Sequence, residues 1–182
     1  MNKSAIAAGF SRAAPTYDRS AKAQRRMAER LTSILPTADQ LRSSSADMPE
    51  RSAPIIELGC GTGLLTERLL ARYPDARLHA IDLAPLMIEH CRRRWAGEPR
   101  AAFEVADAET FRPDGPAALV AANCAFQWLA DAEGTLRHVR GYLAPRGRLA
   151  LGTMLAGSLA ELAESHAAAA GRPMPALDLW DE

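Results

Sequence analysis

Short apolar runs alternate along the chain with segments whose apolar residues recur every three or four positions. Runs of the first kind predict strands at residues 55–58, 78–81, 102–105, 119–122 and 148–153. Segments of the second kind predict helices at residues 64–72, 85–95 and 131–143. Strands that alternate with helices form parallel sheets with both faces covered. The pattern therefore predicts an α/β, Rossmann-like, doubly wound fold whose sheet is mostly parallel.

The segments on either side of this α/β core, residues 54–156, differ from it in composition. Residues 1–36 are expected to be helical, because their apolar positions follow helical spacing until Pro36. Residues 37–53 are rich in Ser, Asp and Arg, which predicts a polar linker or loop. Residues 157–182 predict an alanine-rich helix followed by a short polar tail.

Three glycines on alternate positions follow the first predicted strand, at Gly59, Gly61 and Gly63. About twenty residues later, Asp82 ends the next predicted strand. Glycines in such a loop let the backbone approach a nucleoside, and an acid at the end of the next strand reaches the ribose hydroxyls of that nucleoside. Dinucleotide sites read G-x-G-x-x-G, and their third glycine is replaced here by Leu64, which disfavours a nicotinamide cofactor. The G-x-G-x-G spacing, with Glu57 two residues before it, resembles the first motif of S-adenosylmethionine-dependent methyltransferases.

This resemblance implies a role for several residues around the cofactor. The glycine loop is expected to wrap the methionine part, next to the start of the following helix. Glu57 is expected to hold either the loop or the cofactor's amine, and Asp82 to accept both ribose hydroxyls. Leu83 and Met87 are expected to flank the adenine, although Met87 suits a core position equally well.

Two further candidates follow later strands. Asp107, together with Ala108, comes after the third strand and is expected to accept a hydrogen bond from the adenine amino group. Asn123 ends the fourth strand, at the edge of the sheet where the reacting atoms should lie.

The composition of the chain argues against some partners and ligands but does not indicate one particular enzyme activity. The 182 residues include 22 basic and 22 acidic side chains, a balance that does not suggest a nucleic-acid partner. Three scattered cysteines and four unclustered histidines predict no metal site. A signal peptide and a membrane-spanning apolar run are both missing from the sequence, so we expect a cytoplasmic protein.

Three more segments point to one family: FSRAAPTYD at 10–18 followed by Gln24, NCAFQW at 123–128, and LGT at 151–153 followed by GSLAEL at 157–162. Together they resemble the malonyl-acyl carrier protein O-methyltransferase of biotin synthesis. The segment that contains Gln127 and Trp128 also resembles methyltransferases of trans-aconitate, whose N-terminal segment matches less well.

The resemblance covers nearly the whole chain but not the whole family pattern. The family has seven strands, of which the last two are antiparallel, and the chain shows five. Ala84, Ala106 and the pair Ala117-Ala118 depart from the residues usual in the family. Two expectations therefore stay open: an active enzyme, or a truncated non-catalytic remnant or subunit whose open sheet edge a second chain completes.

The family reaction moves the sulfonium methyl group to the free carboxylate of a malonyl thioester. That carboxylate is ionised at pH 7, so no general base is needed, and alignment and exclusion of water should supply the catalysis. Residues 1–36 are expected to form a lid, and Tyr17, Gln127 and Trp128 to line the acceptor pocket. A packing role suits Tyr17 and Trp128 equally well.

The expected substrate, malonyl-acyl carrier protein, also implies a docking surface, because acyl carrier proteins are acidic. Two groups of arginines are candidates: Arg25, Arg26 and Arg30, or the run Arg92 to Arg94. For either group, a solvated helix face is the alternative.

Overall fold

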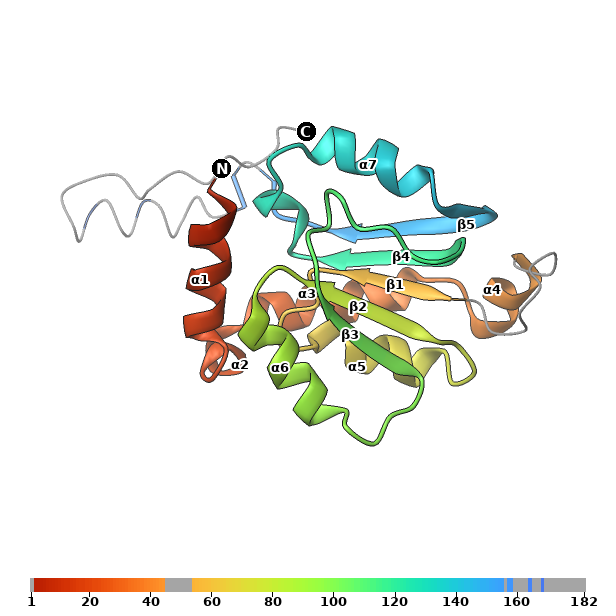
Figure 1. Cartoon of the computed structure of the whole chain (residues 1–182), viewed down its shortest axis with the longest axis horizontal. Coiled ribbons are helices and arrows are strands. Elements are labelled where there is room, and N and C mark those ends of the chain that lie inside the picture. Colours follow the sequence, from red (N-terminus) through yellow and green to blue (C-terminus); the bar gives the residue numbers. More distant parts are fainter. Residues whose placement is uncertain (1, 45–53, 156, 159–163, 165–167, 169–182) are drawn as a thin grey trace.

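Five strands form one parallel sheet in the order β3-β2-β1-β4-β5 (Figure 1). The structure is a computed structural model that describes residues 2–44, 54–155, 157, 158, 164 and 168. The strands are β1 (Ile55–Leu58), β2 (Leu78–Asp82), β3 (Ala101–Val105), β4 (Ala117–Asn123) and β5 (Leu143–Gly152). The predicted doubly wound α/β fold is confirmed, and in the described part of the chain the sheet is parallel throughout.

The two central strands, β1 and β4, are almost completely buried. This is the reason for their continuous apolar sequences, since a strand covered on both faces has no polar side. From β1 the chain continues outward to β2 and β3, and then returns to β4 on the other side of β1. This reversal creates a crevice outside the carboxyl ends of β1 and β4, where ligands of such sheets bind.

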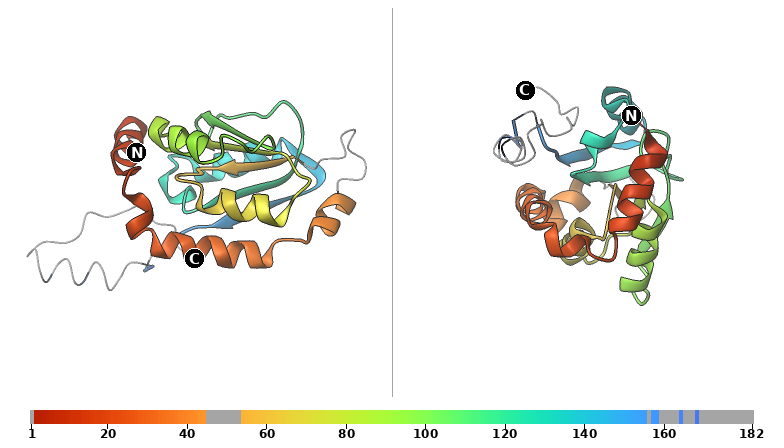
Figure 2. Two further views of the ribbon diagram at one scale, coloured as in Figure 1. Left: turned by 90° about the horizontal axis from the view of Figure 1, so that it is seen from below. Right: turned by 90° about the vertical axis from the view of Figure 1, so that its left-hand side faces the viewer.

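Helices cover both faces of the sheet (Figure 2). One face carries α3 (Lys22–Ile34), α5 (Leu64–Arg72) and α6 (Pro85–Arg94). The other face packs against α7 (Ala132–Arg140), whose Val139 joins Ile56 and Val120 in the core. The short 3-10 helix η1 (Phe126–Trp128) follows β4.

The N-terminal segment forms three helices: α1 (Lys3–Ala13), α2 (Tyr17–Ser20) and α3. Figure 1 shows α1 standing across the carboxyl ends of the strands, over the crevice. Beyond Pro36, part of the expected linker is helical, as α4 (Ala38–Ser44). Thr37 and Gln40 cap this helix reciprocally, because each side chain accepts from the other's backbone N–H. Leu41 then buries its side chain in the core under β4.

The last strand begins five residues earlier than predicted. Residues 145–147, expected to turn the chain into the strand, instead form an irregularity within β5, where the pairing with β4 shifts between Ala117 and Leu119. Gly147 is required there, because a Cβ atom would lie 2.7 Å from the carbonyl oxygen of Ala117.

The helix expected within residues 157–182 falls mainly outside the described residues, so the structure does not test it. In the described part, β5 is an edge strand that pairs with β4. None of the described helices is both long and apolar enough to cross a bilayer.

Candidate active site

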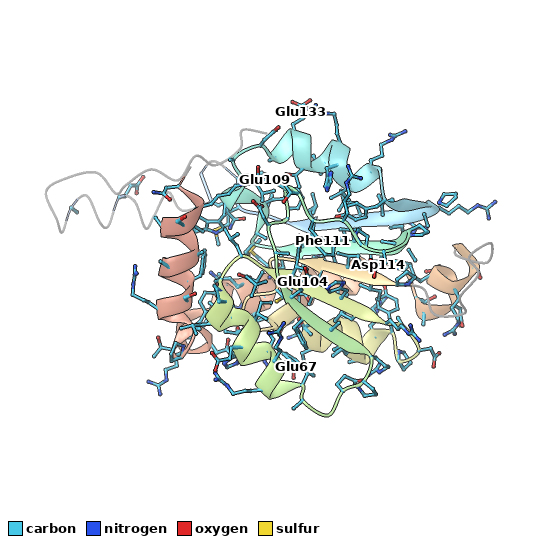
Figure 3. The ribbon with its side chains drawn as sticks, in the orientation of Figure 1. Glu67, Glu104, Glu109, Phe111, Asp114 and Glu133 are labelled. Atoms are coloured by element: carbon cyan, nitrogen blue, oxygen red, sulfur yellow. The ribbon has the colours of Figure 1, made fainter. Side chains whose placement is uncertain are left out.

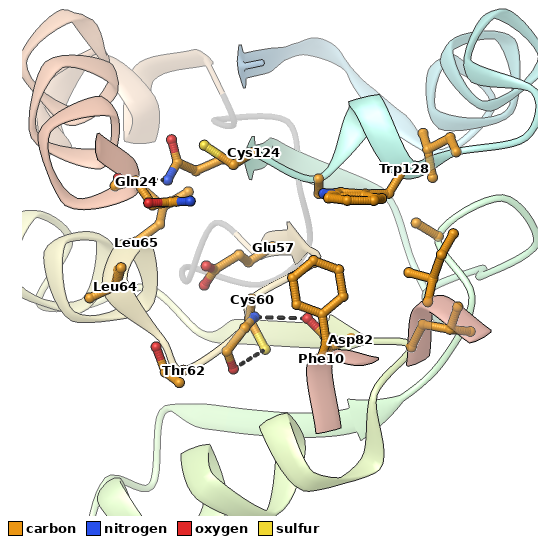
Figure 4. Close-up of a pocket in the computed structure, with 18 of the residues that line it drawn as sticks. Phe10, Gln24, Glu57, Cys60, Thr62, Leu64, Leu65, Asp82, Cys124 and Trp128 are labelled. Carbon is orange, nitrogen blue, oxygen red and sulfur yellow. Dashed lines mark hydrogen bonds between the residues drawn. The ribbon is translucent and has the colours of Figure 1, made fainter. Parts of the chain in front are cut away.

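A pocket opens at the crevice between β1 and β4, beneath α1 (Figure 4). It holds about 900 Å³ of empty space, including the solvent at its mouth. Phe10 and Trp128 stand on one side of the opening, Gln24 and Cys124 on the other, and Glu57 lies at the floor. The pocket therefore combines residues from the N-terminal helices with residues at the ends of four strands.

The glycine loop forms one wall of this pocket and needs glycine for two different reasons. Gly59 has a φ of +71°, and a Cβ atom there would lie 2.4 Å from the Cβ of Ala125. Gly61 has a φ of +56°, but no atom lies within 4 Å of the position of its Cβ. Gly59 thus lets β1 and the segment after β4 approach each other, whereas Gly61 leaves an open surface toward the pocket.

The carboxylate of Asp82 is held in a fixed orientation. Its Oδ2 accepts from the backbone N–H of Gly61 at 2.8 Å, and its Oδ1 accepts from that of Ala84 at 2.8 Å. Burial raises the pKa of Asp82, while these two N–H groups oppose the rise. Each oxygen keeps a further lone pair, so the carboxylate can still accept two hydroxyl groups from a ligand.

Glu57 lies under the loop and is 1% exposed. Its Oε2 accepts from the hydroxyl of Thr66 on α5 at 2.6 Å. Burial raises the pKa of Glu57 to about 8, with the charge of Asp82 adding to the rise and the Thr66 hydrogen bond opposing it. Without a ligand, Glu57 is therefore mainly protonated at pH 7, and a cation beside it would favour its ionised form.

The ends of β2 and β3 bring their acids together. The N–H of Ala106 donates to the carbonyl oxygen of Asp82 at 3.1 Å, so the residues after β3 lie beside Asp82. Asp107 and Ala108 line the pocket there, as does Leu83. The structure thus brings these predicted cofactor contacts into one cavity with Glu57 and Asp82.

The end of β4 carries local backbone strain. Cys124 has a φ of +56°, an unusual value for a residue with a side chain, and such strain is frequent at functional sites. Asn123 lines the pocket and donates from Nδ2 to the carbonyl oxygen of Gln24 at 3.0 Å. Its Oδ1 is buried without a hydrogen-bond partner in the described structure.

Three aromatic side chains close the side of the pocket next to η1. The ring of Phe10 meets that of Trp128 edge-on at 5.2 Å and that of Tyr17 at 6.3 Å. Burial raises the pKa of Tyr17 to about 12, so its hydroxyl is a hydrogen-bond donor at all physiological pH values. The N-terminal segment is also tied to the glycine loop, because the hydroxyl of Thr62 donates to Asp18 at 2.6 Å.

Three predicted site residues do not line the pocket. Met87 is buried with Ala14 and Ala84, so it occupies the core position that its sequence also allowed. Gln127 is 3% exposed and accepts from the hydroxyl of Thr153, behind the pocket wall. Gly63 is the N-cap of α5, and the ring of Trp95 covers the place where its Cβ would lie.

The sequence reasoning missed several lining residues of the N-terminal helices and of the loop after β3. Ile6 and Phe10 enter the pocket from α1, and Gln24 enters from α3. Glu109 lines it two residues beyond Asp107. The spacing of Ile6 and Phe10 in the sequence partly indicated that they act together, since residues three and four apart share a helix face. Within the described residues, no group of three metal-ligating side chains occurs.

A doubly wound sheet with a glycine loop after β1 and an acid after β2, both facing one pocket, defines a nucleoside-binding protein of the Rossmann-like class. The family model described as a methyltransferase domain matches residues 55–147, and the chain belongs to this family.

Curated relatives extend the match beyond that domain. Malonyl-[acyl-carrier protein] O-methyltransferase of Acetivibrio thermocellus is 37% identical over 166 residues, covering 91% of this chain and 55% of that protein. The protein of the same name from Halalkalibacterium halodurans is 33% identical, covering 93% and 62%. Trans-aconitate 2-methyltransferase of Methylobacterium radiotolerans is 40% identical over 116 residues, covering 64% and 42%. The chain thus spans about two-fifths to three-fifths of the length of these relatives.

Solved structures confirm the fold. A complex of the Haloferax volcanii Trm112 methyltransferase activator with a methyltransferase matches with a TM-score of 0.64 at 21% identity, covering 78% of this chain and 58% of that chain. CalS10, an amino pentose methyltransferase from Micromonospora echinaspora bound to S-adenosylmethionine, matches with a TM-score of 0.55 at 24% identity, covering 71% and 52%.

Proposed function

We propose that the pocket binds S-adenosylmethionine and directs its methyl group to a carboxylate on the aromatic side. The observation that carries this proposal is the orientation of Asp82, whose two oxygens are each fixed by one backbone N–H and keep lone pairs toward the pocket. A vicinal diol of ribose fits such a carboxylate.

The remaining lining residues fit the rest of the cofactor. Glu57 would meet the ammonium group of the methionine part, which gives a buried acid the cation it lacks. The open surface at Gly61 would leave room for the part of the methionine group next to the sulfur. Asp107 would accept from the adenine amine, and Leu83 would contact the ring.

When bound, the cofactor supplies an electrophilic methyl group on a sulfonium. Trp128 and Tyr17 would border that methyl group, and their rings favour a cation by about 0.5–2 kcal/mol. Tyr17 can donate a hydrogen bond to an anionic acceptor, because its own proton is held tightly. The lid helix α1 would exclude water, so the ionised acceptor needs alignment rather than a base.

The acceptor that we propose is the free carboxylate of a malonyl thioester on acyl carrier protein, in biotin synthesis. The names of the relatives from A. thermocellus and H. halodurans support it, since they match this chain over about nine-tenths of its length. A small polycarboxylate such as trans-aconitate is the alternative acceptor, which the 40% identical relative favours over a shorter stretch.

The first test is calorimetric titration with S-adenosylhomocysteine, with NAD as the control ligand. We expect micromolar binding of the first alone, and a loss of affinity of roughly tenfold to a hundredfold in Asp82→Ala, because hydrogen bonds to a charged group are removed. Binding of NAD instead would refute the cofactor assignment. Methyl transfer would then be compared on malonyl-acyl carrier protein, free malonate and trans-aconitate, and the carrier-bound substrate should react fastest.

For the carrier, we propose docking at the N-terminal helix α3 rather than at the end of α6. The arginines of α6 are engaged: Arg92 binds the carbonyl oxygen of Phe103, Arg93 pairs with Glu89, and Arg94 pairs with a glutamate of α5. In contrast, Arg26 and Arg30 are exposed on the helix that also supplies Gln24 to the pocket.

The docking proposal is tested by reversing these two charges. Arg26→Glu with Arg30→Glu should lower kcat/KM on malonyl-acyl carrier protein by about tenfold or more at low salt, because the attraction to an acidic partner becomes repulsion. Arg137→Glu on the opposite side of the sheet is the matched control. An equal loss in both variants, or a loss that salt does not change, would contradict docking at α3.

A non-catalytic subunit is the second candidate function, which the exposed edge of the sheet supports. A groove lies along β5, between the end of α3, where Ile34 is 67% exposed, and the side chains of Leu149 and Leu151. A partner that completes the sheet would cover this groove. Methyl transfer by the purified monomer would exclude the need for such a partner.

A further inference from the structure

The first turn of the lid helix reaches the acids that follow β3. Nζ of Lys3 donates to Oδ2 of Asp107 at 2.7 Å and lies 3.0 Å from Oε1 of Glu109. The three side chains are only partly exposed, at 34%, 26% and 12%. Burial alone would lower the pKa of Lys3, but its hydrogen bonds to the two acids raise it above its usual value, so the ammonium group stays charged.

The contact belongs to the same face of α1 that enters the pocket. Lys3, Ile6 and Phe10 are three and four residues apart, so they follow one another along a single side of the helix. Ile6 and Phe10 line the cavity, and Lys3, one turn earlier, contacts the lining residues Asp107 and Glu109. Figure 3 shows Glu109 on the loop after β3, between α1 and α7.

Asp107 is held on two sides. Its Oδ1 accepts from the N–H of Glu109 at 3.0 Å, while Lys3 occupies one lone pair of Oδ2. Glu109 is fixed in turn, because its Oε1 accepts from the N–H of Ala130 at 2.7 Å, just beyond η1. A carboxylate has about four acceptor positions, so Asp107 retains capacity for another donor. Its rotamer is therefore set before a ligand arrives.

We propose that Lys3 is a positioning residue that orients Asp107 to accept the exocyclic amine of adenine, so that the lid contributes to base specificity. The proposal rests on the cofactor site proposed above and adds to it a residue from outside the α/β core. Lys3 acts through Asp107 and Glu109 and does not touch the ligand itself.

The test compares S-adenosylhomocysteine with S-inosylhomocysteine, in which an oxo group replaces the amine. The wild-type protein should prefer the adenine ligand by about tenfold or more, because a site built for a donor rejects an analogue that lacks it. In Lys3→Met the preference should shrink by roughly threefold to tenfold, the effect of one misaligned hydrogen bond. Lys3→Arg should restore most of it.

The chain offers a matched control, since its two lysines are Lys3 and Lys22. Lys22 is exposed at the start of α3, and Lys22→Met should keep the full preference for adenine. An equal loss of affinity for both ligands in Lys3→Met would assign Lys3 a merely structural role and overturn the proposal. Failure of the wild-type protein to bind S-adenosylhomocysteine would instead refute the proposed cofactor site.

A measurement on the wild-type protein covers the case in which Lys3→Met fails to fold. Limited acetylation of amines, followed by mass spectrometry, should modify Lys3 more slowly than Lys22. Addition of S-adenosylhomocysteine should slow the reaction at Lys3 further, by about threefold or more, and leave Lys22 unchanged. No effect of the ligand on Lys3 would overturn the coupling between the lid and the adenine end of the pocket.

Discussion

Glu57→Gln should change the pH dependence of stability, because Glu57 is a buried acid and none of the described side chains that shift its pKa is cationic. Its pKa rises from 4.5 to about 8 on folding. Between these values the unfolded chain has released the proton and the folded chain retains it, so the free energy of unfolding falls as pH rises. Above about pH 8 Glu57 is ionised in both the folded and the unfolded chain, so stability falls no further on its account. The amide of the Glu57→Gln variant would keep an acceptor for Thr66 and remove the titration.

The size of the effect follows from the pKa change. At about 1.4 kcal/mol per pKa unit, the rise corresponds to about 5 kcal/mol between pH 4.5 and pH 8. Glu57 lines an open pocket, and water that enters it reduces the penalty of ionisation. We therefore expect the stability of Glu57→Gln relative to the wild type to increase by about 2–4 kcal/mol from pH 5 to pH 9.

Urea unfolding of both proteins at pH 5, 7 and 9 measures this difference. Groups that titrate in both proteins and lie far from Glu57 cancel in the comparison. Glu133→Gln is the control, since Glu133 is 82% exposed on α7 and should show no trend with pH. A difference between Glu57→Gln and wild type that stays constant within about 1 kcal/mol from pH 5 to pH 9 would refute a raised pKa for this acid.

The other predictions concern the ligand. At pH 7, binding of S-adenosylhomocysteine should release up to one proton from Glu57, seen as a dependence of the binding heat on buffer ionisation; no dependence would place the amine elsewhere. Gly61→Ala should fold with a loss of about 1–2 kcal/mol in the free energy of unfolding but bind S-adenosylhomocysteine weakly. Gly59→Ala should be destabilised more, because its new Cβ clashes with Ala125, and equal stability of the two variants would contradict this distinction. Trp128→Ala should weaken S-adenosylmethionine relative to the neutral S-adenosylhomocysteine by about twofold to thirtyfold, and an unchanged ratio of dissociation constants would exclude a cation–π contribution.

The sequence predicted those parts of the molecule that local pattern determines. The five strands and the helices between them lie within a few residues of their predicted positions, except for the start of β5. Glu57, Asp82, Asp107 and Asn123 meet in one pocket because all lie at or near the carboxyl ends of parallel strands, which share one edge of the sheet. Their proposed roles toward a ligand stay predictions.

Where the structure differs from what the sequence led us to expect, the physical cause differs from place to place. For α4, the capping pair Thr37 and Gln40 was present in the sequence, but the polar composition of the segment led us to expect a loop or linker instead of a helix. For Met87, the rotation of α6 decides between pocket and core, and its contact with Ala14 crosses more than seventy residues of sequence. For Gln127, the turn of η1 directs its side chain toward Thr153, whereas the side chain of its neighbour Trp128 faces the pocket.

The N-terminal segment could not be placed over the pocket from local pattern, because its contacts to the core are all long-range. It is fastened by Lys3 to Asp107, by Asp18 to Thr62 and by Phe10 to Trp128, and α1 contains no buried residue. With about 0.5–1.5 kcal/mol for each such contact, these three hold it by about 2–4 kcal/mol. The N-terminal segment is therefore held by contacts of single side chains and by the packing of Phe10 and Ala14 against Met87, rather than by a buried face of α1 itself.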